Sequence, residues 1–175
     1  MTRLALNFFN AGAAGISYWS LIDQYYGKDA DYQQMQQLGL WKYIKEAYRA
    51  DSTYERIHQD YEVRPQYHSY SLLTRFLKPG ADIYPLDLGE DFAIGTAFQN
   101  ENGKWTYVFA NGTNETKHIA INNENVKGKF EVYRYEESSL PQNDDLITAS
   151  ETINTRSNTL KVEVRANSMI LCRQK

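Results

Sequence analysis

Few residues in this sequence have the types and spacing that suit catalysis. Asp144 and Asp145 are neighbouring carboxylates, but they lie in a polar stretch with no candidate base beside them. That setting favours a solvated loop, with a calcium ligand as the second interpretation. His58, His68 and His118 are scattered along the chain and lack the spacing of metal ligands. The sequence therefore predicts no metal site and no cofactor.

The single cysteine, Cys172, rules out a disulfide within the chain. It lies in the apolar run 169–172, which favours a buried structural thiol over a nucleophile. One cysteine is compatible with oxidising and with reducing compartments, so it leaves the localisation open. Two Asn-x-Thr sequons, at 111–113 and 114–116, are explained equally well by glycosylation and by turn composition.

Composition narrows the classes of partner. The chain has 175 residues and a net charge of -3, from 19 basic and 22 acidic residues, with no run of Lys or Arg. This balance does not favour nucleic acid or an anionic membrane surface. No stretch of apolar residues is long enough for a membrane helix. The 14 tyrosines, 7 phenylalanines and 3 tryptophans suit β structure and sugar binding equally well.

The first half of the chain has a mainly helical pattern. Residues 2–10 read as the end of a helix, and the small residues 11–15 as a turn that stops it. Residues 16–22 are then expected to form a buried strand, and a helix, a turn and such a strand make an αβ unit of a parallel sheet. Residues 24–64 are irregular and partly helical in spacing. Arg64-Pro65 opens a clear helix that ends before Pro79-Gly80.

From residue 81 the apolar residues alternate with a period of two. The expected strands are 83–88, 92–99, 104–110, 117–121, 130–135, 160–164 and 168–173, with a tight hairpin turn at 101–103. Short strands at this spacing favour an antiparallel β-sandwich. Its expected core residues are Val108, Phe109, Ile119, Ile121, Val132, Val162, Val164 and Ile170.

Two motifs in this order resemble the C-terminal end of clan A glycoside hydrolases, the retaining (β/α)8-barrel enzymes that carry a β-sandwich after the barrel. The motifs are GISYWSLIDQ at 15–24 and RPQYHSYSLLTRFLKPG at 64–80. The resemblance implies that the first is the eighth barrel strand and the second the eighth barrel helix. The implied fold class is α+β, a mainly antiparallel β-sandwich (81–175) preceded by a helical remnant of a (β/α)8 barrel (1–80).

The resemblance also implies a carbohydrate site, because such barrels bind substrate at the C-terminal ends of their strands. Trp19 would be an aromatic platform for a sugar ring, and Asp23 and Gln24 would bind hydroxyl groups at the rim. Tyr25 and Tyr26 would stack or pack nearby. Structural alternatives stay open: Trp19 as a core residue and Asp23 as a cap of a loop or helix.

Hydrolysis by this family needs more than these residues. Retaining enzymes use two carboxylates about 5 to 5.5 Å apart. The resemblance places both at positions that would precede Met1, so we expect no catalytic residue in this sequence and no hydrolysis by this chain alone. Parent enzymes of this type are often exported, to the periplasm or the medium, but any export signal would precede Met1, so the localisation stays open.

Two other functions fit the sequence. A free-standing carbohydrate-binding β-sandwich would carry a row of aromatic residues on one sheet face, from Trp105 with Tyr107 or Tyr133 with Tyr135. A structural or interaction domain would have no sugar site. If the chain is instead a piece of a barrel enzyme, the surface left by the barrel is apolar, and we expect self-association through residues 1–60 or disorder there.

Overall fold

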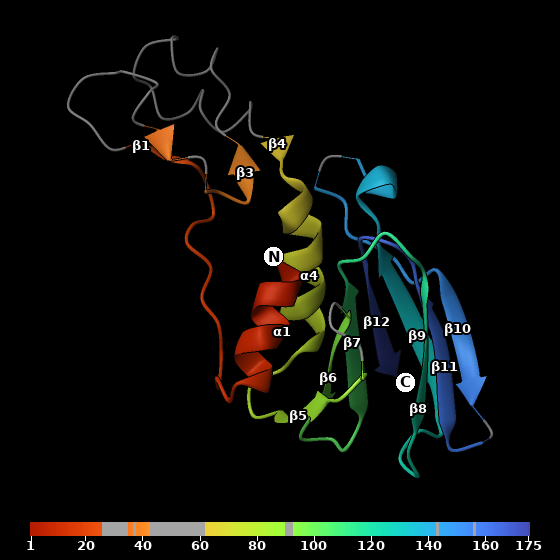
Figure 1. Cartoon of the computed structure of the whole chain (residues 1–175). Helices are drawn as coiled ribbons and strands as arrows, with labels where there is room; N and C mark the ends of the chain where they lie inside the picture. The colour runs from red at the N-terminus through yellow and green to blue at the C-terminus, as the bar shows by residue number, and fades with distance from the viewer. Residues whose placement is uncertain (26–34, 37, 43–61, 90–92, 143, 156) are drawn as a thin grey trace.

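The computed structural model describes residues 1–25, 35–36, 38–42, 62–89, 93–142, 144–155 and 157–175. Within these ranges a helical part is followed by mainly antiparallel strands, which confirms the predicted α+β class. Figure 1 shows helices on one side of the large sheet and a smaller pair of strands on its other side. The large sheet is therefore the middle layer of the structure.

The middle layer is a six-stranded antiparallel sheet with the strand order β10-β9-β12-β7-β6-β5. The C-terminal strand, β12, lies between β7 and β9, so that Leu171 pairs with Val108 on one side and with Tyr133 on the other. The strands are β5 (Asp82–Leu86), β6 (Ala93–Gln99), β7 (Trp105–Asn111), β9 (Gly128–Tyr135), β10 (Glu151–Thr155) and β12 (Ser168–Gln174).

The second sheet pairs β8 (Lys117–Asn122) with β11 (Thr159–Val164) and covers one face of the large sheet. Strand β11 alternates between buried and exposed positions, and its buried residues are Leu160, Val162 and Val164. These residues enter one cluster with Phe109 and Ile170 of the large sheet. The two sheets therefore enclose a common core, as alternation with a period of two predicts.

The aromatic residues that a free-standing carbohydrate-binding β-sandwich would expose lie inside the molecule. Trp105 and Tyr107 stack with their ring centroids 5.9 Å apart, within the core between the two sheets. Tyr133 belongs to the core on the other face of the large sheet, where Tyr135 packs against it. Alternation placed each pair correctly on one face, but those faces are the two core faces.

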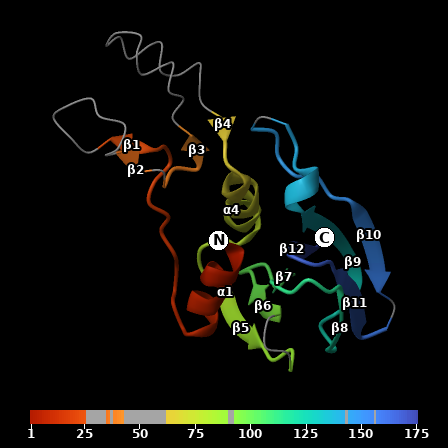
Figure 2. The ribbon, with the colours of Figure 1, turned by 45° about the horizontal axis from the view of Figure 1, so that its top comes forward.

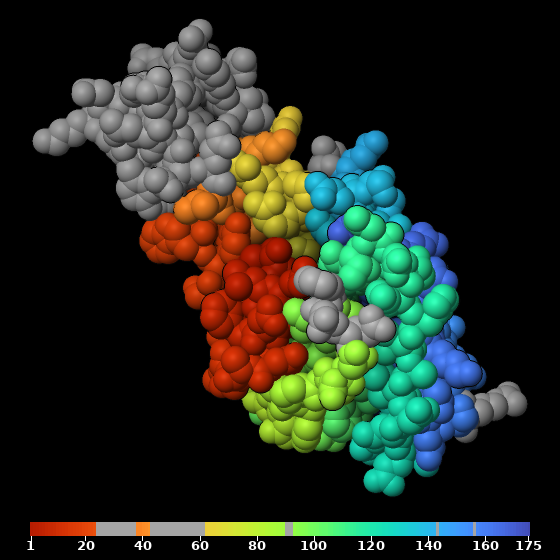
Figure 3. All heavy atoms as spheres, in the orientation of Figure 1, coloured from red at the N-terminus to blue at the C-terminus, as the bar shows by residue number. Residues whose placement is uncertain are grey.

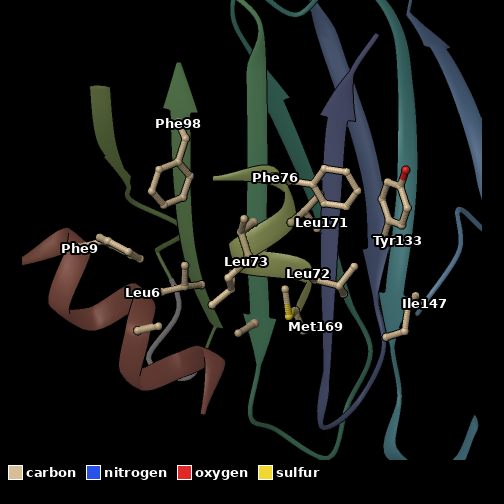
Figure 4. Close-up of a cluster of buried hydrophobic side chains, with 13 residues drawn as sticks. Leu6, Phe9, Leu72, Leu73, Phe76, Phe98, Tyr133, Ile147, Met169 and Leu171 are labelled. Carbon is tan, nitrogen blue, oxygen red and sulfur yellow. The ribbon is translucent and has the colours of Figure 1, made fainter. Parts of the chain in front are cut away.

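Two helices cover the other face of the large sheet (Figure 4). Helix α1 (Thr2–Asn10) contributes Leu6 and Phe9, and helix α4 (Pro65–Phe76) contributes Leu72 and Phe76. The ring of Phe9 meets that of Phe98 edge to face at 5.3 Å, and Phe76 packs on Tyr133 at 4.6 Å. The helical part and the strands thus share one hydrophobic core.

The end of α1 and the start of α4 lie where the sequence predicted, and α4 ends at Phe76, shortly before Pro79-Gly80. Helix α1 stops at Gly12, whose φ of +93° is a conformation that favours glycine, and the Gly12 N–H donates to the Phe9 carbonyl. Pro65 occupies the first position of α4, where its missing N–H costs no helical hydrogen bond. The expected hairpin turn ends at Gly103, with a φ of +76°.

The predicted buried strand at 16–22 is wrong. The structure has bends there; Leu21 and Ile22 are exposed, and only Ile22 forms a bridge, a parallel one with Trp41. A buried parallel strand needs neighbours along both edges and layers over both faces. In the described residues the segment has a partner along one edge only, at 40–41, so its apolar residues remain outside a sheet.

Residues 24–64 lie largely outside the described ranges. The described part contains two short antiparallel pairs, β1 (Gln24–Tyr25) with β2 (Met35–Gln36) and β3 (Trp41–Lys42) with β4 (Glu62–Val63). The sequence also missed strand β10, whose residues are mostly exposed because it forms an edge of the large sheet. An edge strand with one open side needs few apolar residues, so the pattern is weak.

Val162 tests the second sheet. We expect Val162→Asp to lower the free energy of unfolding by about 3 kcal/mol or more, because it buries an unpaired charge between the two sheets. Lys161→Asp introduces the same residue on the exposed side of β11 and should change stability by about 0.5 kcal/mol at most. Urea unfolding followed by circular dichroism measures both. Equal stability of the two variants would show that Val162 does not face a core.

Candidate functional site

The candidate site lies at the start of α4, where three segments far apart in sequence meet. Figures 1 and 2 both show β3 and β4 just beyond this end of the helix. The Leu40 N–H donates to the Ser20 carbonyl at 3.1 Å, and the Trp41 N–H donates to the Leu21 carbonyl at 2.9 Å. The Arg64 N–H donates to the Leu40 carbonyl at 2.8 Å. These backbone bonds fix the segment that carries Trp19 against the start of the helix.

Asp23 connects all three segments through its carboxylate. Its Oδ2 accepts a hydrogen bond from Nη2 of Arg64 at 2.5 Å, and its Oδ1 accepts one from the Gly39 N–H at 2.8 Å. The side chain of Asp23 is 2% exposed and that of Arg64 is 16% exposed. A buried carboxylate needs both a counter-charge and hydrogen bonds, and this one has them. The sequence alternative of Asp23 as a structural cap fits this geometry better than a hydroxyl-binding role.

Gly39 is the residue that the close approach of these segments requires. A Cβ atom at this position would collide with the backbone N of Asp23 and the backbone C of Ile22, and would lie 2.5 Å from the carbonyl O of Trp41. All three atoms belong to the backbone, so no side chain can move aside. In the sequence, Gly39 lies within the irregular, partly helical stretch 24–64, and nothing in that pattern predicts a close contact.

Gly39→Ala tests this junction. We expect the amide hydrogens of Asp23 and Trp41 to exchange at least about tenfold faster, because the backbone must separate to admit the methyl group; tenfold corresponds to about 1.4 kcal/mol. Gly15→Ala is the matched control, since nothing lies within 4 Å of the Cβ position there. Hydrogen exchange followed by NMR reports both amides. Unchanged exchange in Gly39→Ala would contradict the described contact.

Trp19 is the most exposed large apolar residue of this region, with 67% of its surface accessible. Its neighbours are held in place: the Tyr18 hydroxyl donates to the Leu38 carbonyl at 2.8 Å, and the Tyr18 ring packs on Tyr70 of α4 at 5.6 Å. The Trp19–Ser20 peptide bond is cis. An exposed indole on a fixed segment offers a flat apolar face to a ligand.

The other three predicted site residues say little about ligand binding. Gln24 and Tyr25 form the short strand β1, and Tyr26 lies outside the described residues. Trp19 and Asp23 thus belong to one segment, but Trp19 is exposed while Asp23 is buried. Substrate contact by these five residues stays a prediction. Sequence reasoning did not predict the pairing of Arg64 with Asp23, because no local pattern links positions so far apart.

The Asp144–Asp145 pair contacts α4 through its backbone. The Tyr67 hydroxyl donates to the Asp144 carbonyl at 3.1 Å, and burial raises the pKa of Tyr67, with the Asp144 charge adding to the effect. Burial lowers the pKa of His68, and a hydrogen bond to the Asp145 backbone opposes this. His68 is therefore neutral at pH 7. In the part of the chain that the structure describes, no group of His, Cys, Asp and Glu side chains could hold a metal ion.

Cys172 is fully buried in the core between the sheets, and burial raises the pKa of its thiol to about 12. The group is protonated at neutral pH and out of reach of substrates, which agrees with the structural role expected from its apolar neighbours. No helix among the described residues is long and apolar enough to cross a membrane.

No protein-family model and no curated protein matches this sequence. Solved structures do match. An endo-beta1,6-glucanase aligns with 98% of this chain at a TM-score of 0.53 and 17% identity, over 29% of its own length. The catalytic domain of a GH30 xylanase C from Talaromyces cellulolyticus aligns with 79% of this chain at a TM-score of 0.53 and 16% identity, over 27% of its length.

A glycoside hydrolase family 30 subfamily 8 xylanase from Clostridium acetobutylicum gives a TM-score of 0.53 and 15% identity over 79% of this chain and 31% of its own. The chain shares its fold with part of these glycoside hydrolases. It spans less than a third of the length of each. At such identities the likeness concerns the fold, so the activity must be argued from the site.

Proposed function

We propose that this chain is the C-terminal part of a glycoside hydrolase that acts on an oligo- or polysaccharide, and that it does not hydrolyse sugar alone. One observation carries the proposal: Trp19 is 67% exposed on a segment that backbone hydrogen bonds and the buried Asp23–Arg64 ion pair fix to α4. The shared fold with solved xylanases and a glucanase supports it.

In this proposal Trp19 binds and the rest of the enzyme performs the chemistry. The indole stacks against the C–H face of a sugar ring, which orients the glycosidic bond without exchanging a proton. The two carboxylates of a retaining mechanism come from the remainder of the barrel. Asp23 acts as a positioning residue, because its carboxylate oxygens accept hydrogen bonds from Arg64 and Gly39 instead of from a substrate.

We propose that the barrel of the complete enzyme ends, and its β-sandwich begins, near residue 80. Residues 1–80 would complete the barrel, and residues 81–175 would form the β-sandwich that supports it. The sheet supports the helix directly, because α4 packs on it through Leu72 and Phe76. Arg64 lies immediately before the first turn of the same helix. The strands thereby hold the helix whose start positions the Trp19 segment.

The surface expected to face the missing barrel is apolar. On the outer side of α1, Leu4 is 56% and Phe8 51% exposed, and Leu21 beyond the helix is 64% exposed. Figure 3 shows the N-terminal segment, in red, at the surface of this face. We propose that barrel elements preceding Met1 cover this surface in the complete enzyme.

The reading frame upstream of Met1 tests the proposal most directly. We expect it to stay open for about 250 codons, the length that a (β/α)8 barrel requires. In the enzyme that this frame encodes, Trp19→Ala should lower kcat/KM for its oligosaccharide by about tenfold, the loss expected for one stacking contact, and Trp19→Phe should lose less.

Tyr84→Ala is the control, since Tyr84 is also an exposed aromatic residue but belongs to β5, an edge strand of the large sheet outside the Trp19 segment. It should leave kcat/KM unchanged. A stop codon directly before Met1 would overturn the proposal, and so would hydrolysis by the 175-residue chain itself. Equal effects of Trp19→Ala and Tyr84→Ala would remove Trp19 from the site.

Self-association is the second expected consequence. The isolated chain should form dimers or larger species in sedimentation velocity, because two copies bury the apolar surface of α1 that the barrel would cover. Phe8→Glu should shift the chain toward monomer, while Leu146→Glu, which places the same charge at another exposed apolar position, should not. A wild-type chain that stays monomeric at about 100 μM would contradict this use of the α1 surface.

A further inference from the structure

A small cleft lies at the opposite end of α4 from Arg64, between the helix end, the β6–β7 hairpin and the end of β12. Its volume is about 230 Å³. Four cationic side chains line it, Arg75, Lys78, Lys104 and Arg173, and no carboxylate is among the described residues that do. The nearest acidic group of the hairpin, the Glu101 carboxylate, lies beside Gly80. This concentration of positive charge stands out in a chain whose net charge is -3.

Two of the cations are held in place by one aromatic ring. The guanidinium carbon of Arg75 lies 4.8 Å from the centroid of the Phe76 ring, and that of Arg173 lies 5.4 Å from it. Nη1 of Arg75 also donates to the Ile147 carbonyl at 2.9 Å. Phe76 is buried in the core beneath the helices (Figure 4). Cation–π contacts with a fixed ring order both guanidinium groups before any ligand binds.

The protein neutralises these charges only in part. Arg173 pairs with Glu131 at 3.4 Å, but the same carboxylate also pairs with Lys175 at 2.8 Å. No ion pair involves Lys78 or Lys104 anywhere in the described part of the chain. Like charges around one cleft repel each other, and a bound anion offsets that repulsion.

Asn100 provides a further polar group in the cleft. Its Oδ1 atom is buried and has no hydrogen-bond partner among the described residues. A half-turn of the amide exchanges oxygen for the NH2 group, which is a donor. Burying an unpaired acceptor costs free energy, and a partner for the Asn100 amide would offset that cost.

We propose that this cleft binds the oxyanion group of a ligand, a carboxylate or a sulfate or phosphate group. Guanidinium groups match such groups with two parallel hydrogen bonds, and the lysines add charge. The cleft is smaller than the roughly 300 Å³ of typical small-molecule pockets, so it accommodates one anionic group and not a whole oligosaccharide. The site is distinct from the Trp19 region, because α4, with 12 residues, separates them by about 18 Å.

Binding is tested on the intact 175-residue chain with three probes: sodium sulfate, sodium phosphate and sodium glucuronate. Each is titrated at constant ionic strength, balanced with sodium chloride, and followed by calorimetry and by the amide NMR signals of 100–104. We expect saturable binding of at least one probe, with signal changes at the hairpin. Tighter binding of sulfate and phosphate assigns the site to tetrahedral anions, and tighter binding of glucuronate assigns it to carboxylated sugars.

The variant Lys78→Gln/Lys104→Gln should weaken binding by about tenfold or more. Both lysines are exposed, so their loss leaves the core intact, which circular dichroism confirms. Lys161→Glu is the matched control, because reversing one lysine lowers the net charge by the same two units as neutralising two. It should bind like the wild type.

Absence of saturable binding for all three probes would overturn the proposal. Equal weakening by the double variant and by Lys161→Glu would also overturn it, since net charge alone would then explain the effect. The anion site does not depend on the proposed glycosidase origin. An unbroken reading frame without anion binding would refute only the proposed anion site. Anion binding together with a stop codon directly before Met1 would refute only the proposed glycosidase origin.

Discussion

The structure depends on the burial of one six-stranded sheet on both of its faces. Along β7 every residue is buried, and successive side chains alternate between two cores: Val108 packs beneath the helices, and Phe109 packs beneath the second sheet. Strand β12 does the same with Leu171 and Ile170. A sheet of this kind requires a layer on each side, because either bare face would expose a large apolar area to water. The helices before residue 80 are therefore integral to the strands after it.

The exposed Trp19 is the last element in a series of contacts that begins in this sheet. Leu72 fixes α4 on the sheet, and Arg64, directly before α4, pairs with Asp23. Asp23 holds its own segment through Gly39, and that segment presents Trp19. A side chain on a loop keeps a fixed position only if a rigid scaffold holds its segment, and here the scaffold is the hydrophobic core. The cationic cleft uses the other end of the same helix.

The likeness to solved glycoside hydrolases at 15–17% identity has a physical basis in this arrangement. Burial on two faces constrains which positions are apolar and roughly how large they are, and it constrains little else. Sequences that meet this constraint can therefore differ at most positions while the layers stay the same. The shared layers leave the ligand open, because it depends on a few exposed side chains that the fold does not dictate.

The sequence alone determined the elements whose pattern is local. Alternation with a period of two located the strands of residues 81–175 apart from the edge strand β10, and Arg64-Pro65 marked the start of α4. Only the tertiary structure decided whether residues 16–22 form a buried strand, because an apolar run does so only when strands pair with it along both edges. It also decided the partnership of Asp23 with Arg64, which are 41 positions apart. Pairing over such a distance depends on how the helix and the segments pack, and no local pattern of residue types encodes that.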